Sequence, residues 1–366
     1  MKTLYKSILG VLTLMMLLFT FSSCSEDSPK SDLSHQQPDP VAPVIDRTAF
    51  PLGADVSWLT QLENEGKTFS GADGVQKECM TLLRDTCGVN SIRLRVWVNP
   101  AEGYCNLGDV VLKAYRATQL GMRVMIDFHF SDDWADPSKQ TTPKAWEEYD
   151  IDQMKEAVTK HVTEVLGKLK ELNITPEWVQ IGNEVNNGML WPLAKVSNTG
   201  GPQNFAALVT AGYDAVKAID ASIKVIVHIA ADNKKSRYDY IFGSLKNNGA
   251  AEKYDLIGIS LYPDNPSVTS LSIEEYMNEA YTNIQYGKNT YGKDVMICEF
   301  GMNYEAAAKC NEVITDILNK QKAGAPIAGI FYWEPECPPG YNGGYSYGAF
   351  NAKGQPTEAL KAYCKY

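Results

Sequence analysis

The stretch that decides the fold runs from RVMIDF (123–128) through MKEAVTKHVTEVLGKLKEL (154–172) to WVQIGNE (178–184). The first and last pieces contain short apolar runs, as expected of strands buried on both faces. In the middle piece apolar residues recur with a period near 3.6 residues, which is typical of an amphipathic helix. A strand, a helix and a second strand in this order predict a unit with two parallel strands.

The same alternation continues on both sides of this unit. Residues 205–219 and 273–284 repeat the helical period. Apolar runs that can form strands lie at 52–56, 91–97, 123–128, 178–181, 224–229, 256–260, 295–298 and 327–332. Eight buried parallel strands with helices between them predict an α/β fold, a single (β/α)8 TIM barrel over residues 50–366. An open doubly wound sheet is the alternative, but no GxGxxG motif follows the first run.

The first 23 residues have the pattern of an export signal. Two lysines precede an apolar run over residues 8–21, and a pair of serines then precedes Cys24. A Cys directly after two small residues resembles the bacterial lipoprotein signal, so residues 1–23 are predicted as a lipoprotein signal peptide and Cys24 as the site of lipid attachment. The alternative is an ordinary signal peptide in which Cys24 has no role.

Residues 24–49 are rich in Ser, Asp, Gln and Pro and show no apolar period, which predicts a flexible tether. The acidic residues directly after Cys24 resemble signals that send lipoproteins to the outer face in some Gram-negative bacteria. We therefore expect an outer membrane lipoprotein, exposed on the cell surface, that contacts the membrane only through its lipid. A monomer is expected.

Composition excludes some classes of function. Acidic residues outnumber basic ones by 44 to 34, giving a net charge of −10, which argues against a nucleic-acid partner. Without Cys24, seven of the eight cysteines remain, so at least one thiol is free. No Cys or His spacing indicates zinc. Cys298 lies within an apolar run and is expected to be a buried thiol.

In a barrel of this kind the functional residues gather at the carboxyl ends of the strands. The residues there are Asp55, Trp58, Arg95, Trp97, Asp127, His129, Asn183, Glu184, His228, Tyr262, Asp264, Glu299, Trp333 and Glu334. A single Glu at a strand end is usually a hydrogen-bonding partner of a loop. However, Glu184 ends the fourth run and Glu299 ends the seventh, and glycoside cleavage requires two opposed carboxyl groups. These two residues are predicted to be the catalytic pair.

The motifs resemble those of clan A glycoside hydrolases, and specifically the arabinogalactan endo-β-1,4-galactanases of glycoside hydrolase family 53. The matching stretches are GADVSWL (53–59), SIRLRVWVNP (91–100), VMIDFHFSDDWADPSKQTTPKAW (124–146), WVQIGNEVNNGMLWP (178–192), ISLYP (259–263) and FYWEP (331–335). The resemblance implies endo-acting hydrolysis of β-1,4-galactan, as in pectin side chains, and of galactooligosaccharides, with retention of anomeric configuration. It also implies that Glu184 is the acid/base and Glu299 the nucleophile.

The chemistry predicts supporting roles beside this pair. Glu184 must start protonated, so its pKa must be raised by the charge of Glu299 and by partial desolvation. Arg95 is predicted to keep Glu299 ionised, with a salt bridge in the barrel floor as its alternative. Tyr262 is expected to donate a hydrogen bond to Glu299, and Asn183 to bind the sugar 2-OH.

The remaining strand-end residues are predicted to line the cleft. Trp333 is the expected platform for a sugar ring, with Trp97 and Trp134 as further contacts or as core residues. His129 and Asp127 are expected at the same rim of the cleft, and Asp55, at the end of the first strand, is expected to support this rim. For His129 a purely structural role is the alternative. Glu334 and Asp132 are expected to contact sugar hydroxyls or loops.

No cofactor is predicted. Some members of the resembled family bind calcium near strands seven and eight, but few carboxylates lie in that stretch here, so no metal is expected. Another clan A β-glycanase, a mannanase or cellulase, is the closest alternative activity. A non-catalytic surface glycan-binding protein is the alternative from another class, and the intact glutamate pair counts against it.

Overall fold

The computed structural model describes residues 44–230 and 234–366. The predicted signal peptide, Cys24 and most of the predicted tether lie outside the described residues. At the end of that tether, Arg47 donates a hydrogen bond to the carbonyl oxygen of Thr175 at 3.0 Å and pairs with Glu177 at 3.4 Å. The last residues before the barrel are therefore attached to it.

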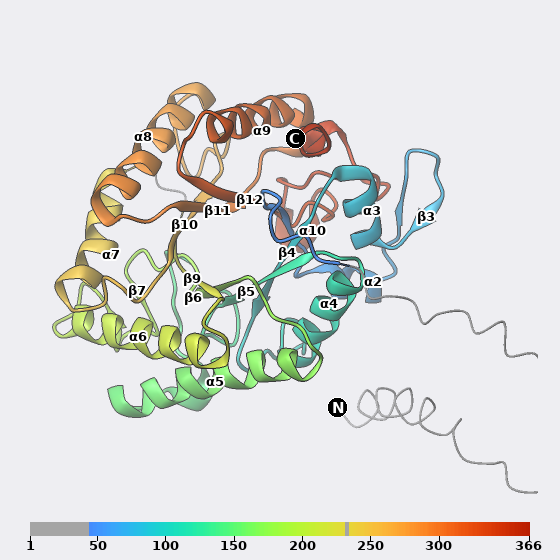
Figure 1. Ribbon diagram of the computed structural model, residues 1–366. Helices are drawn as coiled ribbons and strands as arrows, with labels where there is room; N and C mark the ends of the chain where they lie inside the picture. Colours follow the sequence, from blue (N-terminus) through green and yellow to red (C-terminus); the bar gives the residue numbers. More distant parts are fainter. Residues whose placement is uncertain (1–43, 231–233) are drawn as a thin grey trace, which may run out of the picture. The chain divides into compact units, whose positions relative to one another are not determined.

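The predicted barrel is confirmed, and Figure 1 shows its strands enclosed by helices. Eight parallel strands close in the order β1-β12-β11-β10-β9-β6-β5-β4. Their bounds are β1 Leu52–Asp55, β4 Ser91–Val96, β5 Arg123–Phe128, β6 Trp178–Ile181, β9 Lys224–Ile229, β10 Leu256–Leu261, β11 Val295–Phe300 and β12 Ile327–Trp333. Every predicted strand is present, with its ends within about two residues of the prediction.

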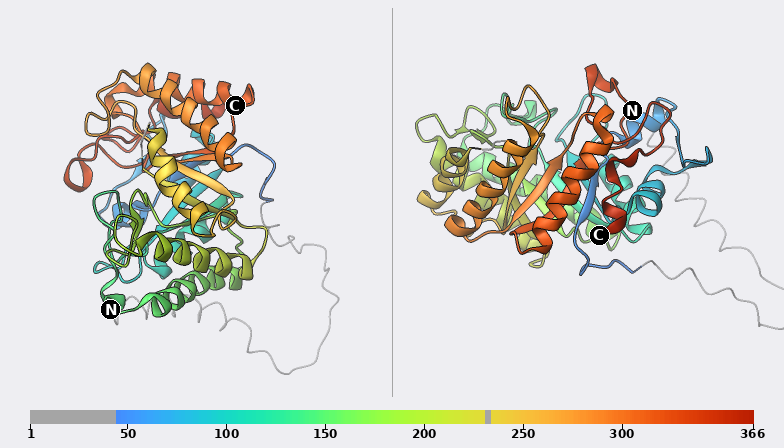
Figure 2. Two further views of the ribbon diagram at one scale, coloured as in Figure 1. Left: turned by 90° about the vertical axis from the view of Figure 1, so that its left-hand side faces the viewer. Right: turned by 90° about the horizontal axis from the view of Figure 1, so that it is seen from above.

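Helices cover the outside of the strands, as two further views in Figure 2 show. The α-helices are α2 Leu59–Asn64, α3 Cys79–Cys87, α4 Leu107–Gln119, α5 Ile151–Glu171, α6 Gly201–Ile219, α7 Lys235–Asn247, α8 Ile273–Tyr291, α9 Ala307–Lys322 and α10 Tyr341–Gly344. Short 3-10 turns are η1 Lys144–Trp146, η2 Tyr304–Ala306, η3 Glu358–Leu360 and η4 Tyr363–Lys365. A regular (β/α)8 barrel has a long helix after its last strand. Here β12 is followed instead by a long loop that includes the short α10, and then by η3 and η4.

Local sequence explains where the longest helices begin. Asp150 and Gln153 form a reciprocal capping box at the start of α5, and Ser272 and Glu275 form another at the start of α8. Each box satisfies backbone N–H groups that the first turn leaves unpaired. The apolar stripe predicted for residues 154–172 is buried in α5 up to Leu169, so the helical period marks the face that packs on the barrel. Leu172, its last predicted member, follows the end of the helix and is exposed.

Two short antiparallel hairpins interrupt the alternation. One pairs β2 Phe69–Ser70 with β3 Gln76–Lys77. The other pairs β7 Gly188–Met189 with β8 Ala194–Lys195, directly after the predicted acid/base in the loop that follows β6. Among the described residues, no helix combines the length and apolar character needed to cross a membrane.

The barrel interior has two layers. The first, which we call the lower layer, is a separate buried apolar cluster of Met125, Trp178, Ile226, Met296, Cys298 and Phe331. Trp178 and Phe331 come from strands that are not neighbours, and their rings lie 5.9 Å apart, so this layer fills the inside of the barrel. Cys298 is a buried free thiol, as predicted, and all seven cysteines of the described residues are free.

The second layer, the upper layer, is polar and follows the first along the strands. It consists of Asp55, Arg93, Asp127, Gln180, His228, Ser260 and Glu299, each at most 6% exposed. In a strand, residues two apart share a face. On the inward face of β5, Met125 is thus followed by Asp127. On the inward face of β9, Ile226 is followed by His228 in the same way. The fold therefore buries a set of charged groups at the carboxyl ends of its strands.

Candidate active site

Glu299 reaches the upper layer through an irregularity in β11. The register between β10 and β11 shifts, so that Ile259 pairs with Ile297 but Ser260 pairs with Glu299. Simple alternation would turn Glu299 outward, because Cys298 already faces the interior. A bulge re-aims the next side chain. It brings Glu299 inside, while Phe300 packs against Tyr332 in the outer apolar core.

Glu184 lies two residues beyond Gly182 in the loop after β6. Both have a positive φ, +86° for Gly182 and +47° for Glu184. Glycine adopts this backbone freely, whereas a residue with a side chain is strained there, and such strain is concentrated at functional sites. The turn leaves Glu184 partly exposed at the opening of the barrel.

The two predicted catalytic glutamates face each other across a cleft of about 220 Å³. One carboxylate oxygen of Glu184, one of Glu299 and a ring nitrogen of His228 lie within 4.8 Å of one another. The cleft is lined by His129, Trp134, Ala135, Asp136, Asn183, Glu184, Tyr262, Glu299 and Trp333. A sugar that enters it meets both carboxyl groups together with indole and phenol rings.

Glu299 is held by a cation and a phenol. Nη2 of Arg93 lies 3.0 Å from Oε1 of Glu299, and the Tyr262 hydroxyl donates to Oε2 at 2.9 Å. The predicted contact from Tyr262 is confirmed. The prediction that Arg95 holds Glu299 is wrong, because Arg95 pairs with Glu334 at 2.8 Å. Arg95 lies too close to the end of β4 to reach the centre of the barrel, which Arg93 occupies from two residues earlier.

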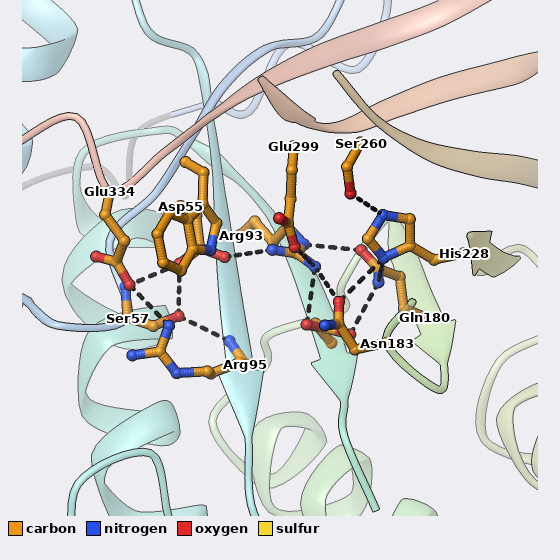
Figure 3. Close-up of polar contacts among 12 residues, drawn as sticks. Asp55, Ser57, Arg93, Arg95, Gln180, Asn183, His228, Ser260, Glu299 and Glu334 are labelled. Atoms are coloured by element: carbon orange, nitrogen blue, oxygen red, sulfur yellow. Dashed lines mark hydrogen bonds and ion pairs between the residues drawn. The ribbon is translucent and has the colours of Figure 1, made fainter. Parts of the chain in front are cut away.

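Arg93 is the hub of the upper layer, as Figure 3 shows. Its guanidinium is 1% exposed and donates to Asp55 at 2.6 Å and to Asp127 at 2.8 Å. It also donates to Gln180 at 2.7 Å and to Asn183 at 2.9 Å. A buried guanidinium needs such partners, because an unpaired charge in a protein interior is very costly. Asp55 and Asp127 therefore support the site from below the cleft.

Among the described residues, the side chain that donates a hydrogen bond to the Glu184 carboxyl is Ser260, through its hydroxyl at 2.7 Å. His228 lies behind Ser260, with Nε2 at 2.9 Å from the hydroxyl oxygen and Nδ1 at 3.1 Å from Nε2 of Gln180. Ser260 donates to Glu184, so its oxygen can accept from Nε2 of His228. Nδ1 of His228 also lies 3.0 Å from Oδ1 of Asn183. Burial lowers the pKa of His228 well below its usual value, so the ring is neutral.

These contacts decide which carboxyl holds the proton. Burial, and next the charge of Glu299, raises the pKa of Glu184 to about 8. Burial also raises the pKa of Glu299, but Arg93 and the Tyr262 hydroxyl oppose this shift by stabilising the anion. Two close carboxyl groups share one proton at neutral pH. It resides on Glu184, because Glu299 has the cation. The predicted rise in the pKa of Glu184 has the causes expected for it, with burial the larger.

His129 and Asn183 line the cleft, as predicted, and are held from behind. The Nε2 atom of His129 lies 3.0 Å from Asp127, and its Nδ1 accepts from Trp97 and from the backbone N–H of Ala135, both at 3.2 Å. Asn183 donates to the carbonyl oxygen of Ala135 at 2.8 Å. Its contact with the sugar 2-OH stays a prediction.

The predicted tryptophans divide into two groups. Trp134 and Trp333 line the cleft. Trp97 packs behind them, with its ring 5.3 Å from that of Trp134. Glu334 is fully buried, and Asp132 accepts hydrogen bonds from the backbone N–H groups of Asn99 and Lys144 at 3.0 and 2.9 Å. Both carboxylates are thus loop contacts, one of the two roles expected for them.

Among the described residues, the group with the right donors for a metal is Glu184, His228 and Glu299. It fits a metal poorly. The Arg93 cation already pairs with Glu299, and both ring nitrogens of His228 already have polar partners, Ser260 at Nε2 and Gln180 at Nδ1. A divalent cation would have to displace these partners and sit beside a guanidinium. These contacts leave the two carboxyl groups to each other and to whatever enters the cleft.

Reasoning from the sequence did not select Arg93, Gln180 or Ser260. A signal was available for the first two: each is a polar residue inside an apolar strand, where burial requires a partner. Arg93 also alternates with Arg95, so both can face inward. Ser260 carries no such signal, because a serine in a strand is common.

The comparisons with known proteins agree with this geometry. The model of glycosyl hydrolase family 53 matches residues 51–363. The chain belongs to this family. The family 53 match therefore covers all eight barrel strands and the whole of the cleft.

Curated relatives are also similar to this family 53 chain over most of its length. The probable arabinogalactan endo-beta-1,4-galactanase A of Neosartorya fischeri is 36% identical over 309 residues, which cover 77% of this chain and 83% of the relative. The arabinogalactan endo-beta-1,4-galactanase A of Aspergillus niger is 31% identical over 304 residues, covering 77% and 84%. An uncharacterized protein of Niallia circulans, from a bgaB 5' region, is 39% identical over 222 residues, and the match covers 59% of each chain.

Solved structures support the same family 53 assignment. One from a study of two fungal beta-1,4-galactanases has a TM-score of 0.77 and 26% identity, covering 87% of this chain and 100% of the other. The GH53 catalytic domain of Ignisphaera aggregans has a TM-score of 0.73 and 27% identity, covering 88% and 98%.

Proposed function

We propose that this family 53 hydrolase is an arabinogalactan endo-β-1,4-galactanase that retains anomeric configuration. The observation that carries the proposal is the asymmetry of the glutamate pair: Glu299 has Arg93 and Tyr262 as partners, whereas Glu184 has a raised pKa and one hydroxyl partner. Two carboxyl groups this close fit the short spacing of retaining enzymes better than the wider spacing of inverting ones. The curated relatives named as galactanases support the substrate.

In the first step Glu184 protonates the glycosidic oxygen while Glu299 attacks the anomeric carbon. The C–O bond to the leaving sugar breaks, and a covalent galactosyl–enzyme forms on Glu299. Glu299 loses its negative charge when it becomes an ester, which removes one of the causes that raise the pKa of Glu184. Glu184, now deprotonated, can therefore act as the base of the second step. In the second step Glu184 takes a proton from water, which attacks the same carbon and releases Glu299.

The remaining cleft residues bind the substrate in this proposal. Trp333 and Trp134 line the cleft, and the C–H face of galactose can pack on an indole ring. Asn183 lies beside Glu184 and is suited to bind the 2-OH, a contact that strengthens in the transition state. The substrates are β-1,4-galactan and galactooligosaccharides.

Hydrolysis of purified polysaccharides tests the activity. The wild-type protein should release reducing sugar from β-1,4-galactan and much less from mannan or cellulose, and Glu184→Gln should abolish release in the same assay. Equal or greater activity on mannan or cellulose would favour the other clan A activities. Binding to galactan without hydrolysis would favour a surface glycan-binding protein.

The location of the protein is a separate proposal that rests on the N-terminal sequence. Lipid on Cys24 would hold the enzyme at the outer membrane, facing outward, while the tether lets the barrel reach the polymer. Cys24→Ala should leave hydrolysis of soluble galactan unchanged and move the protein from the membrane fraction to the soluble fraction. A Cys24→Ala protein that still fractionates with membranes would contradict lipid attachment at this residue.

A further inference from the structure

Glu334 has three features that the catalytic steps do not explain. It follows Trp333 at the end of β12, its backbone φ is +45°, and its side chain is 0% exposed. Glu184 is the other glutamate of the described residues with a positive φ. Strain of this kind persists where the surrounding structure over-determines a position, and it is concentrated at functional sites.

The carboxylate of Glu334 joins two segments that are distant in the sequence. It accepts the backbone N–H of Trp58, at 3.2 and 3.1 Å from its two oxygens, and Nη1 of Arg95 at 2.8 Å. Its own backbone N–H donates to the carbonyl oxygen of Asp55 at 3.0 Å. Glu334 therefore ties the loop after β12 to the loop after β1 and to β4 at the edge of the cleft.

Arg95 in turn faces three indole rings. Its guanidinium carbon lies 5.4 Å from the ring centroid of Trp58, 5.2 Å from that of Trp97 and 4.2 Å from that of Trp134. Within the described part of the chain, its Nε and Nη2 atoms have no hydrogen-bond partner. The cation is thus balanced by one carboxylate and by ring faces, an arrangement suited to a planar guanidinium.

These rings continue to the surface of the cleft. The ring of Trp58 lies 5.1 Å from that of Trp333, and the ring of Trp134 lies 6.0 Å from it. Trp134 and Trp333 line the cleft together with the catalytic glutamates, whereas Trp58 is 5% exposed and lies beneath. We call Trp58, Trp97, Trp134 and Trp333 the aromatic wall.

We propose that Glu334 is a positioning residue: through Arg95 and the backbone of Trp58 it sets the orientation of the aromatic wall on which a sugar ring of the substrate stacks. That a sugar ring stacks on the wall rests on the proposed function. That Glu334 and Arg95 order the wall does not depend on the substrate. Glu334 does not reach the reacting atoms. Its loss should therefore weaken binding of the polysaccharide and affect the chemical steps little.

The buried carboxyl group of Glu336 helps to show that Glu334 is the one that pairs with Arg95 as an anion. Burial, and next the charge of Glu334, raises the pKa of Glu336 well above its usual value, so Glu336 is protonated. Burial raises the pKa of Glu334 to about 7, and Arg95 opposes this shift. Of the two carboxyl groups, Glu334 therefore loses its proton first, because it is the one that pairs with Arg95.

The test compares Glu334→Gln with a matched control at the other end of the barrel. Arg123 also lies over an indole, 5.1 Å from the ring of Trp178, and pairs with Glu177 at 3.5 Å. Both variants remove the carboxylate beside an Arg–Trp contact. For Glu334→Gln we expect KM for galactan to rise about tenfold with kcat changed less than about threefold, and acrylamide to quench tryptophan fluorescence more strongly. Glu177→Gln should leave KM and kcat unchanged.

Glu334→Gln leaves the buried Arg95 without its carboxylate, which threatens the folding of that variant. A second variant therefore tests the same contact without removing the ion pair. Arg95→Lys keeps the ion pair but replaces the planar group that faces the rings. It should show the same rise in KM and the same increase in quenching. Wild-type KM and quenching in a folded variant would overturn the proposal. A fall in kcat at constant KM would also overturn it, since it would place Glu334 in the chemistry.

The outcomes separate this proposal from the proposed activity. If the wild-type protein fails to hydrolyse galactan, the galactanase assignment fails. The quenching experiment, which uses no substrate, still decides whether Glu334 and Arg95 order the wall. If galactan is hydrolysed and quenching is unchanged in both variants, the activity stands and the positioning role is wrong.

Discussion

The two interior layers of the barrel are built on the same strands and have opposite chemistry. In β9, Ile226 belongs to the lower layer and His228, two residues later, to the upper layer. In β5, Met125 and Asp127 are divided in the same way. The lower layer is stabilised by dispersion and the hydrophobic effect, whereas the upper layer is stabilised by ion pairs and hydrogen bonds. The comparison separates a layer that only stabilises the barrel from one that also positions the reacting groups.

If this division is right, the largest effects on activity belong to the two glutamates of the cleft. Either alanine variant should lower galactan hydrolysis by about four orders of magnitude or more. Their responses should differ with an aryl galactoside, whose leaving group hardly needs protonation. In Glu184→Ala the intermediate should accumulate, and added azide should release it as the β-galactosyl azide. In Glu299→Ala azide should attack directly and give the α-azide.

Product NMR distinguishes the two anomers. Glu184→Gln and Glu299→Gln, which match the shape of glutamate, serve as controls that the alanine cavity admits the azide. The same anomer from both alanine variants would contradict the assigned roles.

The next largest effect is expected at the hub of the upper layer. Arg93→Lys keeps a positive charge but cannot reach Asp55, Asp127 and Glu299 together, because an ammonium lacks the planar fork. Activity should fall about 100-fold or more, and the free energy of unfolding should fall by about 3–5 kcal/mol. Steady-state kinetics and urea unfolding measure the two losses. A variant with nearly full activity would mean that Glu299 needs no guanidinium.

A change in the lower layer should lower stability and leave activity almost unchanged. Ile226→Ala removes methyl groups from a fully buried site and should lower the free energy of unfolding by about 2–5 kcal/mol. Its kcat/KM at a temperature where it stays folded should remain within about twofold of the wild type. Urea unfolding and steady-state kinetics check both values. A large loss of activity in the folded variant would show that the two layers are coupled.

The smallest effect is a shift of the pH profile. Glu184 must be protonated to act as the acid, so activity should fall above its pKa, near 8. The Ser260 hydroxyl donates to the Glu184 carboxylate and so favours the charged form, which lowers that pKa. In Ser260→Ala the pKa should rise and the alkaline limb should move to higher pH. A kcat/KM profile against pH shows this, and a shift to lower pH would contradict the contact.

Much of the fold could be read from the sequence because its signals are local. Each barrel strand is a short apolar run, and burial on both faces is visible in its composition. The period of residues 154–172 marks the face of α5 that packs on the barrel. Glu184 and Glu299 could be selected for a similar reason, since Glu184 follows one such run by three residues and Glu299 directly follows another.

The sequence by itself thus determined the strands, the helical faces and the two glutamates, whereas the tertiary structure decided how the side chains pair. Arg93 and Arg95 are equivalent in the sequence, yet closure of the barrel brings Glu299 to the first and Glu334 to the second. The shift of register in β11 turns Glu299 inward against the simple alternation. Pairing depends on the register and tilt of strands that are distant in the chain, and these are set only when the barrel closes.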